Sequence, residues 1–146
     1  PREDRSLFLR SIMLFWLMGA TDGHAKNFSI FIRPGGRYQL APLYDVLSVE
    51  PSVSQHFIAP KQVRMAMRVG KKGHYRAVDI RGKDFIQTGA QAGYSESEVQ
   101  AAMHFIHTSW ERAFELACAH TTDVVPDQIA KSIESAFRTR LPRLTP

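Results

Sequence analysis

The stretch GATDGHAKN (residues 19–27), followed by PLYD (residues 42–45), is the part of this sequence that decides the fold. An apolar segment, residues 7–18, runs into Gly19, and the polar loop after it leads into the alternating segment FSIFI (residues 28–32). Loops mounted between rigid elements are where catalytic groups tend to lie. This loop supplies Asp and Asn oxygens, the hard ligands that Mg²⁺ prefers when phosphate oxygens and water fill its other positions. The pattern therefore predicts a site that handles phosphate.

The spacing of the acidic and amide residues narrows the chemistry. In protein kinases, an Asp that orients the attacking hydroxyl is followed five positions later by a metal-binding Asn, and a second metal-binding Asp follows a strand pair. Asp22 and Asn27 have the same five-residue offset, and Asp45 ends the next hairpin. An Asp and an Asn five apart also occur by chance in many loops, so the spacing alone only favours a kinase.

The residues around this spacing are more specific. GATDGHAKNFS (residues 19–29), a Gly-Gly turn and LAPLYDV (residues 40–46) closely resemble the C-terminal lobe of HipA-type kinases, the serine/threonine kinase toxins of bacterial toxin–antitoxin modules. The resemblance is strongest over residues 7–47 and continues more weakly through residues 61–76 and the C-terminal third. It implies an α+β, mostly α-helical domain like a protein-kinase C-terminal lobe, in which a small β-hairpin carries the catalytic and metal-binding loops.

The resemblance also implies a role for three residues. Asp22 would be catalytic, Asn27 would bind Mg²⁺, and Asp45 would be the Mg²⁺ ligand that corresponds to the Asp of the Asp-Phe-Gly motif. The sequence YDV (residues 44–46) departs from that motif, so the usual Phe-driven switch between active and inactive states is not expected.

Two further polar residues of the loop are candidates. His24 stands two positions after Asp22, where protein kinases usually have Lys, and Asp-x-His-x-x-Asn looks more like the catalytic loop of phosphoinositide kinases. Its imidazole could donate to the transferring phosphoryl group, or it could hydrogen-bond the loop backbone and fix its shape. Lys26 is assigned to binding of the nucleotide, with a solvated lysine as the alternative.

We expect residues 1–146 to form one domain, a catalytic lobe without the lobe that grips the nucleotide. A kinase needs a Gly-rich cover over the nucleotide and a lysine that pairs with its phosphates. Neither pattern is present, since GKKG (residues 70–73) is not a Walker sequence. ATP is therefore expected as a substrate held mainly by a lobe outside this chain, and the chain alone is expected to be inactive.

The resemblance also implies partners. These are a protein substrate, such as a translation factor or an aminoacyl-tRNA synthetase, and a DNA-binding antitoxin. The alternative to a kinase is a non-catalytic, pseudokinase-like module that serves as a binding surface for the antitoxin or another partner. Intact Asp22, Asn27 and Asp45 favour the enzyme, because a lobe kept only for docking has no chemical need for all three.

The charge of the chain is +5 and is unevenly distributed. Residues 61–76 contain six Lys or Arg residues and His74. Three interpretations remain: docking of an anionic substrate, indirect contact with operator DNA in a repressor complex, or solubility.

Cys118 is the only cysteine, which excludes an internal disulfide and fits a reducing cytosol. No segment is long and apolar enough to span a bilayer, so a cytoplasmic location without membrane contact is expected.

The N-terminal half is expected to hold one helix, a hairpin and a third strand. Asp4 or Ser6 could cap the helix, and Gly19 ends it. Residues 28–33 and 37–41 are predicted to be strands joined by PGG (residues 34–36). Residues 48–60 should be irregular, and residues 63–69 should form a strand with one wet face, or a strip of activation segment.

The C-terminal half is expected to be helical. Helices are predicted over residues 81–92, from a Ser95 capping box to His120, and from Pro126 onward. The apolar stripe of the long helix is expected in the core: Val99, Ala102, Phe105, Ile106, Trp110, Ala113, Phe114 and Ala117. His104, His107 and Glu111 could in principle share a face and bind a metal, but a structural role is favoured because they interleave with this stripe.

Overall fold

The computed structural model describes residues 2–121 and 127–146. The α-helices of this part are α1 (Arg2–Leu17), α2 (Glu50–Ser54), α3 (Gly82–Gln91), α4 (Glu96–His120) and α5 (Asp127–Arg140). The strands are β1 (Ile30–Arg33), β2 (Arg37–Leu40), β3 (Arg64–Val69) and β4 (His74–Arg76). They form two antiparallel pairs, β1 with β2 and β3 with β4. The predicted class, a mostly helical α+β domain with a small hairpin, is confirmed.

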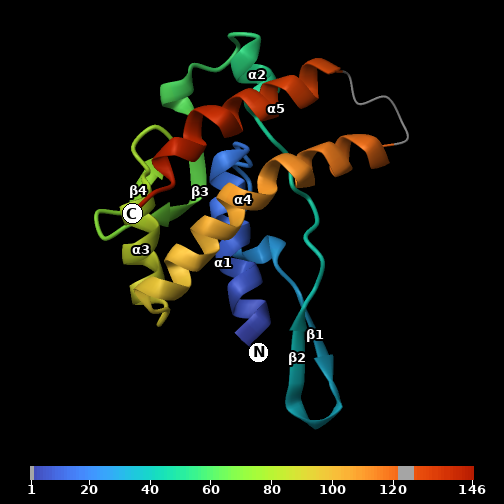
Figure 1. The fold of residues 1–146 in the computed structure, drawn as a ribbon, viewed down its shortest axis with the longest axis vertical. Coiled ribbons are helices and arrows are strands. Elements are labelled where there is room, and N and C mark those ends of the chain that lie inside the picture. The colour runs from blue at the N-terminus through green and yellow to red at the C-terminus, as the bar shows by residue number, and fades with distance from the viewer. Residues whose placement is uncertain (1, 122–126) are drawn as a thin grey trace.

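The helices form one body, and the first hairpin projects from it. Figure 1 shows α4 and α5 crossing α1, with α3 and the β3–β4 pair at one side. α1 packs on α4, α3 packs on α4, and α2 packs on α5. The β1–β2 hairpin extends away from the helices, and all four residues of β1 are exposed. The connections at the base of this hairpin carry the predicted site residues.

The core lies between α1, α3 and α4. Trp16 is fully buried, its ring centroid lies 5.5 Å from that of Phe85, and its Nε1 donates a 3.0 Å hydrogen bond to the carbonyl of Ala77. A second aromatic pair, Trp110 and Phe137, stacks at 4.9 Å and joins α4 to α5. Fully buried apolar side chains of this size contribute roughly 1.5–3 kcal/mol each to folding. The core therefore holds α1, the helix that leads into the predicted catalytic loop, on several sides.

The predicted start of the first helix is wrong. α1 begins at Arg2, so Asp4 and Ser6 lie inside the helix and not at its N-terminal boundary. The Oδ1 atom of Asp4 instead accepts a 3.1 Å hydrogen bond from the backbone nitrogen of Leu40, so a tertiary contact uses this carboxylate. The predicted end is confirmed, because the helix closes at Leu17 and Gly19 follows with φ of +66°.

Two further boundaries differ from the sequence prediction. Residues 48–60 were expected to be irregular but contain α2. Pro51 lies in the first turn of this helix, where a missing N–H costs nothing. The strand predicted at residues 63–69 is present as β3, but its partner β4 was not predicted. β4 has only three residues, too short for an alternation pattern to be visible.

For the long helix α4, the predicted N-terminal cap is confirmed, and the predicted apolar core stripe is confirmed only in part. The side chain of Ser95 accepts a hydrogen bond from the backbone nitrogen of Glu98, as a capping box requires. The buried positions of α4 are Val99, Ala102, Met103, Ile106 and Trp110. Phe105 is half exposed, and Ala113 and Ala117 are exposed, contrary to the prediction. The guanidinium of Arg10 lies over the Phe105 ring, 4.4 Å from its centre.

Two of the three polar residues considered on this helix make contacts within the protein. The Nε2 atom of His107 lies 3.0 Å from the carbonyl of Leu144, and Glu111 forms an ion pair with Arg138.

Helix α5 is present as predicted, although its expected start at Pro126 lies outside the described residues. Within the described part of the chain, none of the helices has the length and apolar character needed to cross a membrane.

Candidate active site

Gly19 separates helix α1 from the predicted catalytic loop. Its positive φ places it in the left-handed region that glycine adopts without strain. The next amide, that of Ala20, donates a 2.8 Å hydrogen bond back to the carbonyl of Phe15, which closes the helix end. The loop then runs to a short 3-10 turn, Ala25–Asn27, directly before β1. A rigid helix therefore sets the starting point of the loop.

The middle of the loop rests on Phe15. The backbone of Gly23 lies so close to this ring that a Cβ atom there would overlap it. Phe15 is buried, and its ring centroid lies 5.7 Å from that of Phe28, the residue that follows the loop. One aromatic side chain thus supports the loop at its centre and at its end.

Asp22 and Asn27 are held within a single turn. The Nδ2 atom of Asn27 donates a 2.8 Å hydrogen bond to the backbone carbonyl of Asp22, and the backbone nitrogen of Asn27 donates to the carbonyl of His24 at 2.9 Å. The first bond engages the amide nitrogen, so the amide oxygen is the atom that Asn27 can offer to a cation. The Asp22 side chain is 65 % exposed, which leaves its carboxylate accessible to a substrate.

His24 faces the carboxylate of Asp22. Its Nε2 atom lies 3.3 Å from Oδ1 of Asp22. Its Nδ1 atom is buried and has no hydrogen-bond partner among the described residues. In the same part of the chain, no hydrogen bond joins the ring to the loop backbone, which is the contact that a purely structural role would use.

Asp45 enters the site from the other side of the hairpin. The hydroxyl of Tyr44 lies 2.8 Å from Oγ of Ser29 and 3.4 Å from the carbonyl of Lys26, so the segment of Asp45 is tethered to the loop. Asp45 has φ of +55°, an uncommon conformation for a residue with a side chain and one found often at functional sites. In the described residues no hydrogen bond or ion pair joins Asp45 to Asp22, His24 or Asn27.

Lys26 takes part in this tether through its backbone. Its carbonyl is the acceptor for Tyr44, and its side chain is exposed. Contact of its ammonium group with a nucleotide stays a prediction.

The candidate oxygen donors are Asp22 and Asn27 of this loop and Asp45 of the segment after β2. Two carboxylates and an amide are the ligand types that Mg²⁺ prefers. The described residues contain no group of three or more His, Cys, Asp or Glu side chains that could hold a metal ion by themselves. Carboxylate and amide donors of this kind commonly bind Mg²⁺ together with substrate phosphates and water.

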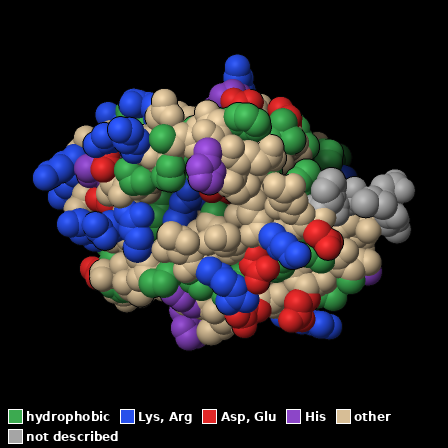
Figure 2. Space-filling model, turned by 90° about the horizontal axis from the view of Figure 1, so that it is seen from above, with side chains coloured by type: hydrophobic (Ala, Val, Ile, Leu, Met, Phe, Trp, Pro, Cys, Tyr) green, Lys and Arg blue, Asp and Glu red, His purple; other side chains and the backbone are tan. Residues whose placement is uncertain are grey.

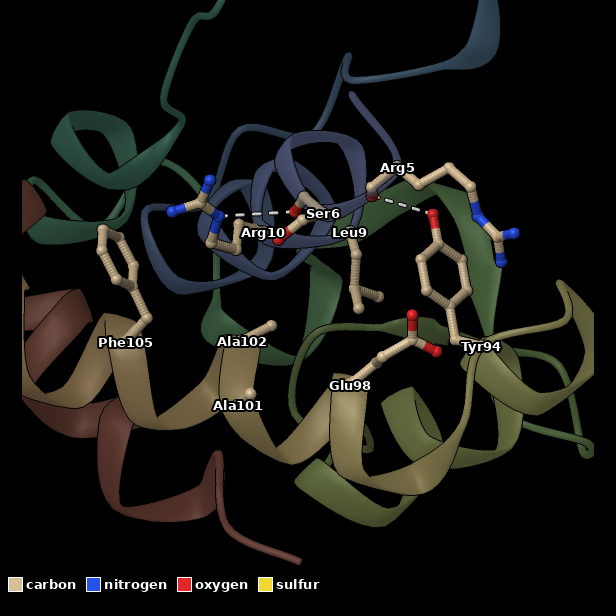
Figure 3. Close-up of a pocket in the computed structure, with 9 residues that line it drawn as sticks. All are labelled: Arg5, Ser6, Leu9, Arg10, Tyr94, Glu98, Ala101, Ala102 and Phe105. Atoms are coloured by element: carbon tan, nitrogen blue, oxygen red, sulfur yellow. Dashed lines mark hydrogen bonds between the residues drawn. The ribbon is translucent and has the colours of Figure 1, made fainter. Parts of the chain in front are cut away.

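A separate cleft of about 280 Å³ lies between α1 and α4 (Figure 3). Its lining residues are Arg5, Ser6, Leu9, Arg10, Tyr94, Glu98, Ala101, Ala102 and Phe105. The guanidinium groups of Arg5 and Arg10 lie over the rings of Tyr94 and Phe105, at 4.5 Å and 4.4 Å from the ring centres. None of the five predicted site residues lines this cleft, so the candidate active site is the open loop.

A basic face covers the β3–β4 side of the molecule. Residues 61–83 contain eight Lys or Arg against one acid, a net +7, whereas the rest of the chain has eleven against thirteen, a net −2. Figure 2 shows these basic side chains gathered at the left, over β3, β4 and the start of α3. Arg64 and Arg68 project from the exposed face of β3, and the exposed ring of Tyr75 lies 5.7 Å from the Arg64 guanidinium. In this face an ion pair joins Arg76 to Asp79.

Two charged residues at the start of the loop were not predicted from the sequence. Glu50 and Arg140 are both buried, and an Arg140 nitrogen lies 2.6 Å from a Glu50 oxygen. The two are 90 positions apart, in segments predicted as an irregular loop and as the end of an amphipathic helix. Only Pro51, which marks a helix start, offered a signal in the sequence.

Together, the mostly helical body, the projecting hairpin and the loop at its base define the C-terminal lobe of a kinase-like fold. The chain belongs to the HipA-like C-terminal domain family, whose model matches residues 1–114. It is 37 % identical over 82 residues to the Sinorhizobium fredii protein named "Putative kinase Y4mE", a match that covers 56 % of this chain and 18 % of that protein.

The structure is also similar to a chain in the complex of HipA, HipB and operator DNA from Shewanella oneidensis MR-1. The TM-score is 0.73 at 16 % sequence identity, and the match covers 96 % of this chain and 32 % of that chain. At this sequence identity the similarity establishes the fold alone. The two coverages show that the chain spans less than a third of the length of either protein.

Proposed function

We propose that this lobe carries the catalytic residues of a HipA-type serine/threonine protein kinase, which transfers the γ-phosphoryl group of ATP to a protein hydroxyl. The observation that carries the proposal is the hydrogen bond from the Asn27 amide to the backbone of Asp22. It joins the side chain of Asn27 to the backbone of Asp22, whose carboxylate is exposed. Phosphoryl transfer depends mainly on such positioning, because the protein itself does little covalent chemistry.

In the proposed reaction, Asp22 orients the substrate hydroxyl and takes its proton. The hydroxyl oxygen forms a bond to the γ-phosphorus while the bond from that phosphorus to the ADP oxygen breaks. His24, 3.3 Å from Asp22, is placed to donate to the transferring group and to stabilise its charge. Asn27 and Asp45 are the residues that would hold Mg²⁺, which when bound neutralises charge on the phosphates. Lys26 is proposed to contact the nucleotide.

The family match and the kinase name of the Sinorhizobium fredii relative support this proposal. Because the chain spans 18 % of that relative, the Gly-rich cover and the phosphate-binding lysine are proposed to lie in another part of the full-length protein.

We propose a DNA-binding antitoxin as the partner of the full-length protein, since the structural neighbour was solved with HipB and operator DNA. The basic face at residues 61–83 then has a natural role beside the operator, because clustered Lys and Arg bind phosphate backbones without regard to sequence. A protein substrate with an acidic surface is the competing use of the same face.

One observation favours a second function, that of a partner-binding surface. The β1–β2 hairpin exposes apolar side chains, with Ile32 80 % exposed and Ile30 54 % exposed. Exposed apolar groups that lie together commonly mark an interaction surface. A non-catalytic lobe could use this hairpin to bind the antitoxin or another partner.

The dependence of activity on Mg²⁺ distinguishes the two functions. In the full-length protein, Asn27→Ala and Asp45→Ala should each lower turnover and raise the Mg²⁺ concentration that gives half-maximal rate. Gln39→Ala, on the exposed hairpin, serves as the control and should change neither. If both variants keep the Mg²⁺ dependence of the unmutated protein, the two residues do not form the metal site.

A further inference from the structure

The buried pair of Glu50 and Arg140 lies against Gly19, where the candidate catalytic loop begins, and against the end of α1. The side chains are 7 % and 10 % exposed, and the Nη2 atom of Arg140 lies 2.6 Å from Oε1 of Glu50. Removing two charges from water is costly, so a buried pair persists only when good geometry and further hydrogen bonds compensate. The contacts of each partner show where those hydrogen bonds lead.

Arg140 closes the end of the helix that precedes the catalytic loop. Its Nη1 atom donates to the carbonyls of Trp16 at 3.0 Å and Leu17 at 3.2 Å. Both carbonyls belong to the last turn of α1, where helix carbonyls lack partners within the helix. A positive charge at a helix C-terminus is also favourable to the helix dipole. The last residue of α5 therefore fixes the point at which the loop begins.

Glu50 contacts the first residue of the same loop. Its carboxylate lies against the Cα of Gly19, so close that a Cβ atom there would overlap it. Glu50 itself opens α2, shortly after Asp45 in the chain. The carboxylate thus joins the segment that leads into Asp22 and Asn27 to the segment that leaves Asp45.

Two backbone contacts join the same two segments. The Oγ atom of Ser48 donates to the carbonyl of Met18 at 2.6 Å, and the backbone nitrogen of Val49 donates to the carbonyl of Gly19 at 3.0 Å. Residues 18–19 and 48–50 are therefore held side by side, and the guanidinium of Arg140 bonds to Glu50 and to the helix end just before Met18.

We propose that Glu50 and Arg140 are positioning residues for the magnesium–nucleotide site. The pair holds the Asp22–Asn27 loop and the Asp45 segment in one fixed relation and touches none of the proposed ligands. This inference rests on the proposed function, because the two segments need a fixed relation only if their side chains bind one ligand together.

Conservative variants of the full-length protein test the inference. Arg140→Lys keeps the charge but loses the planar fork that reaches Glu50 and two carbonyls at once. Glu50→Gln keeps the shape and one acceptor oxygen. Arg138→Lys is the matched control, because Arg138 lies on the same helix and forms exposed ion pairs with Glu134 and Glu111. Two readouts are measured on the same samples: calorimetric binding of ADP with and without Mg²⁺, and hydrogen exchange of peptides covering residues 14–23, 44–54 and 96–110.

We expect Arg140→Lys and Glu50→Gln to weaken Mg²⁺-dependent ADP binding by roughly 10- to 100-fold, the range seen when a residue that supports metal ligands is changed. ADP binding without Mg²⁺ should change little. Exchange should rise in residues 14–23 and 44–54 and stay unchanged in residues 96–110 of α4. Arg138→Lys should alter neither readout.

The inference fails if the two variants exchange faster in both loop segments, or merely unfold at lower temperature, while Mg²⁺–ADP affinity is unchanged. The pair would then serve stability alone. If the unmutated protein binds no Mg²⁺–ADP, the proposed function fails and the inference fails with it. Binding of Mg²⁺–ADP by the unmutated protein therefore distinguishes a failure of the inference alone from a failure of the proposed function.

Discussion

Gly23 lies against the ring of Phe15, so the loop that carries Asp22 rests on the last turns of the helix before it. Phe15 is buried and in contact with Phe28, and it cannot move aside without disturbing the core. The position of the proposed catalytic carboxylate therefore depends on the absence of a side chain at residue 23.

Gly23→Ala tests this dependence. The added methyl group must displace the Phe15 ring or lift the loop, and overpacking of this kind costs about 1–3 kcal/mol of unfolding free energy. Urea unfolding of Gly23→Ala, Phe15→Leu and the double variant measures the cost. The smaller side chain of Leu should relieve part of it, so the double variant should be less destabilised than the sum of the singles. Strict additivity would contradict the contact as the cause.

His24→Ala tests the role of the imidazole beside Asp22. We expect phosphoryl transfer in the full-length protein to fall by roughly 10²-fold, the usual cost of removing one group that stabilises transition-state charge. His24→Gln, whose amide reaches toward the Nε2 position, should recover part of the rate. Thermal unfolding of both variants controls for folding. Transfer by His24→Ala at the unmutated rate would show that the ring serves only the shape of the loop.

Removing charge from the basic face should weaken DNA binding by the complex of the full-length protein with its antitoxin. Arg68→Ala with Lys72→Ala removes two exposed cations. The slope of log affinity against log salt should shrink by about 0.9 for each DNA phosphate that is no longer neutralised. Arg33→Ala with Arg37→Ala, on the projecting hairpin, is the control of equal charge. Equal slopes for the two double variants would exclude the basic face from DNA contact.

Residues 1–146 alone should fold but bind ATP weakly. The buried aromatic and aliphatic core supports cooperative unfolding, which circular dichroism during heating would show. Two carboxylates and an amide recruit Mg²⁺ chiefly together with phosphates held by other residues. Calorimetric titration with ATP and Mg²⁺ should give a Kd no tighter than roughly millimolar, about −4 kcal/mol. A micromolar Kd would mean that this lobe holds further nucleotide contacts.

The sequence predicted those parts of the fold whose signals are local. These signals are Gly19, the PGG turn and the Ser95 capping box, and each acts through neighbouring residues. The helices and strands whose ends they mark are present. The roles of Asp22 and Asn27 came from the resemblance to HipA-type kinases and stay predictions. The structure places Asp22, His24 and Asn27 in one turn whose hydrogen bonds span at most five positions.

The remaining features depend on contacts between distant segments. Asp4 appeared to be a helix cap, but its carboxylate accepts a hydrogen bond from Leu40, 36 positions away. Phe105 has helical spacing with the core stripe, yet its ring is half exposed and lies under the Arg10 guanidinium. The Glu50–Arg140 pair spans 90 positions and joins two segments that have no pattern in common. Local periodicity contains no information on such pairings.

The most direct test of the central claim is phosphoryl transfer by the full-length protein with Asp22→Ala. The radiolabelled γ-phosphate of ATP is followed into a protein substrate or into the protein itself, at saturating Mg²⁺, with thermal unfolding measured in parallel. Because the Asp22 side chain is exposed and contributes positioning rather than packing, we expect transfer to be abolished while folding is unchanged. Transfer at a tenth of the unmutated rate or more would contradict the assignment of Asp22 as the catalytic residue.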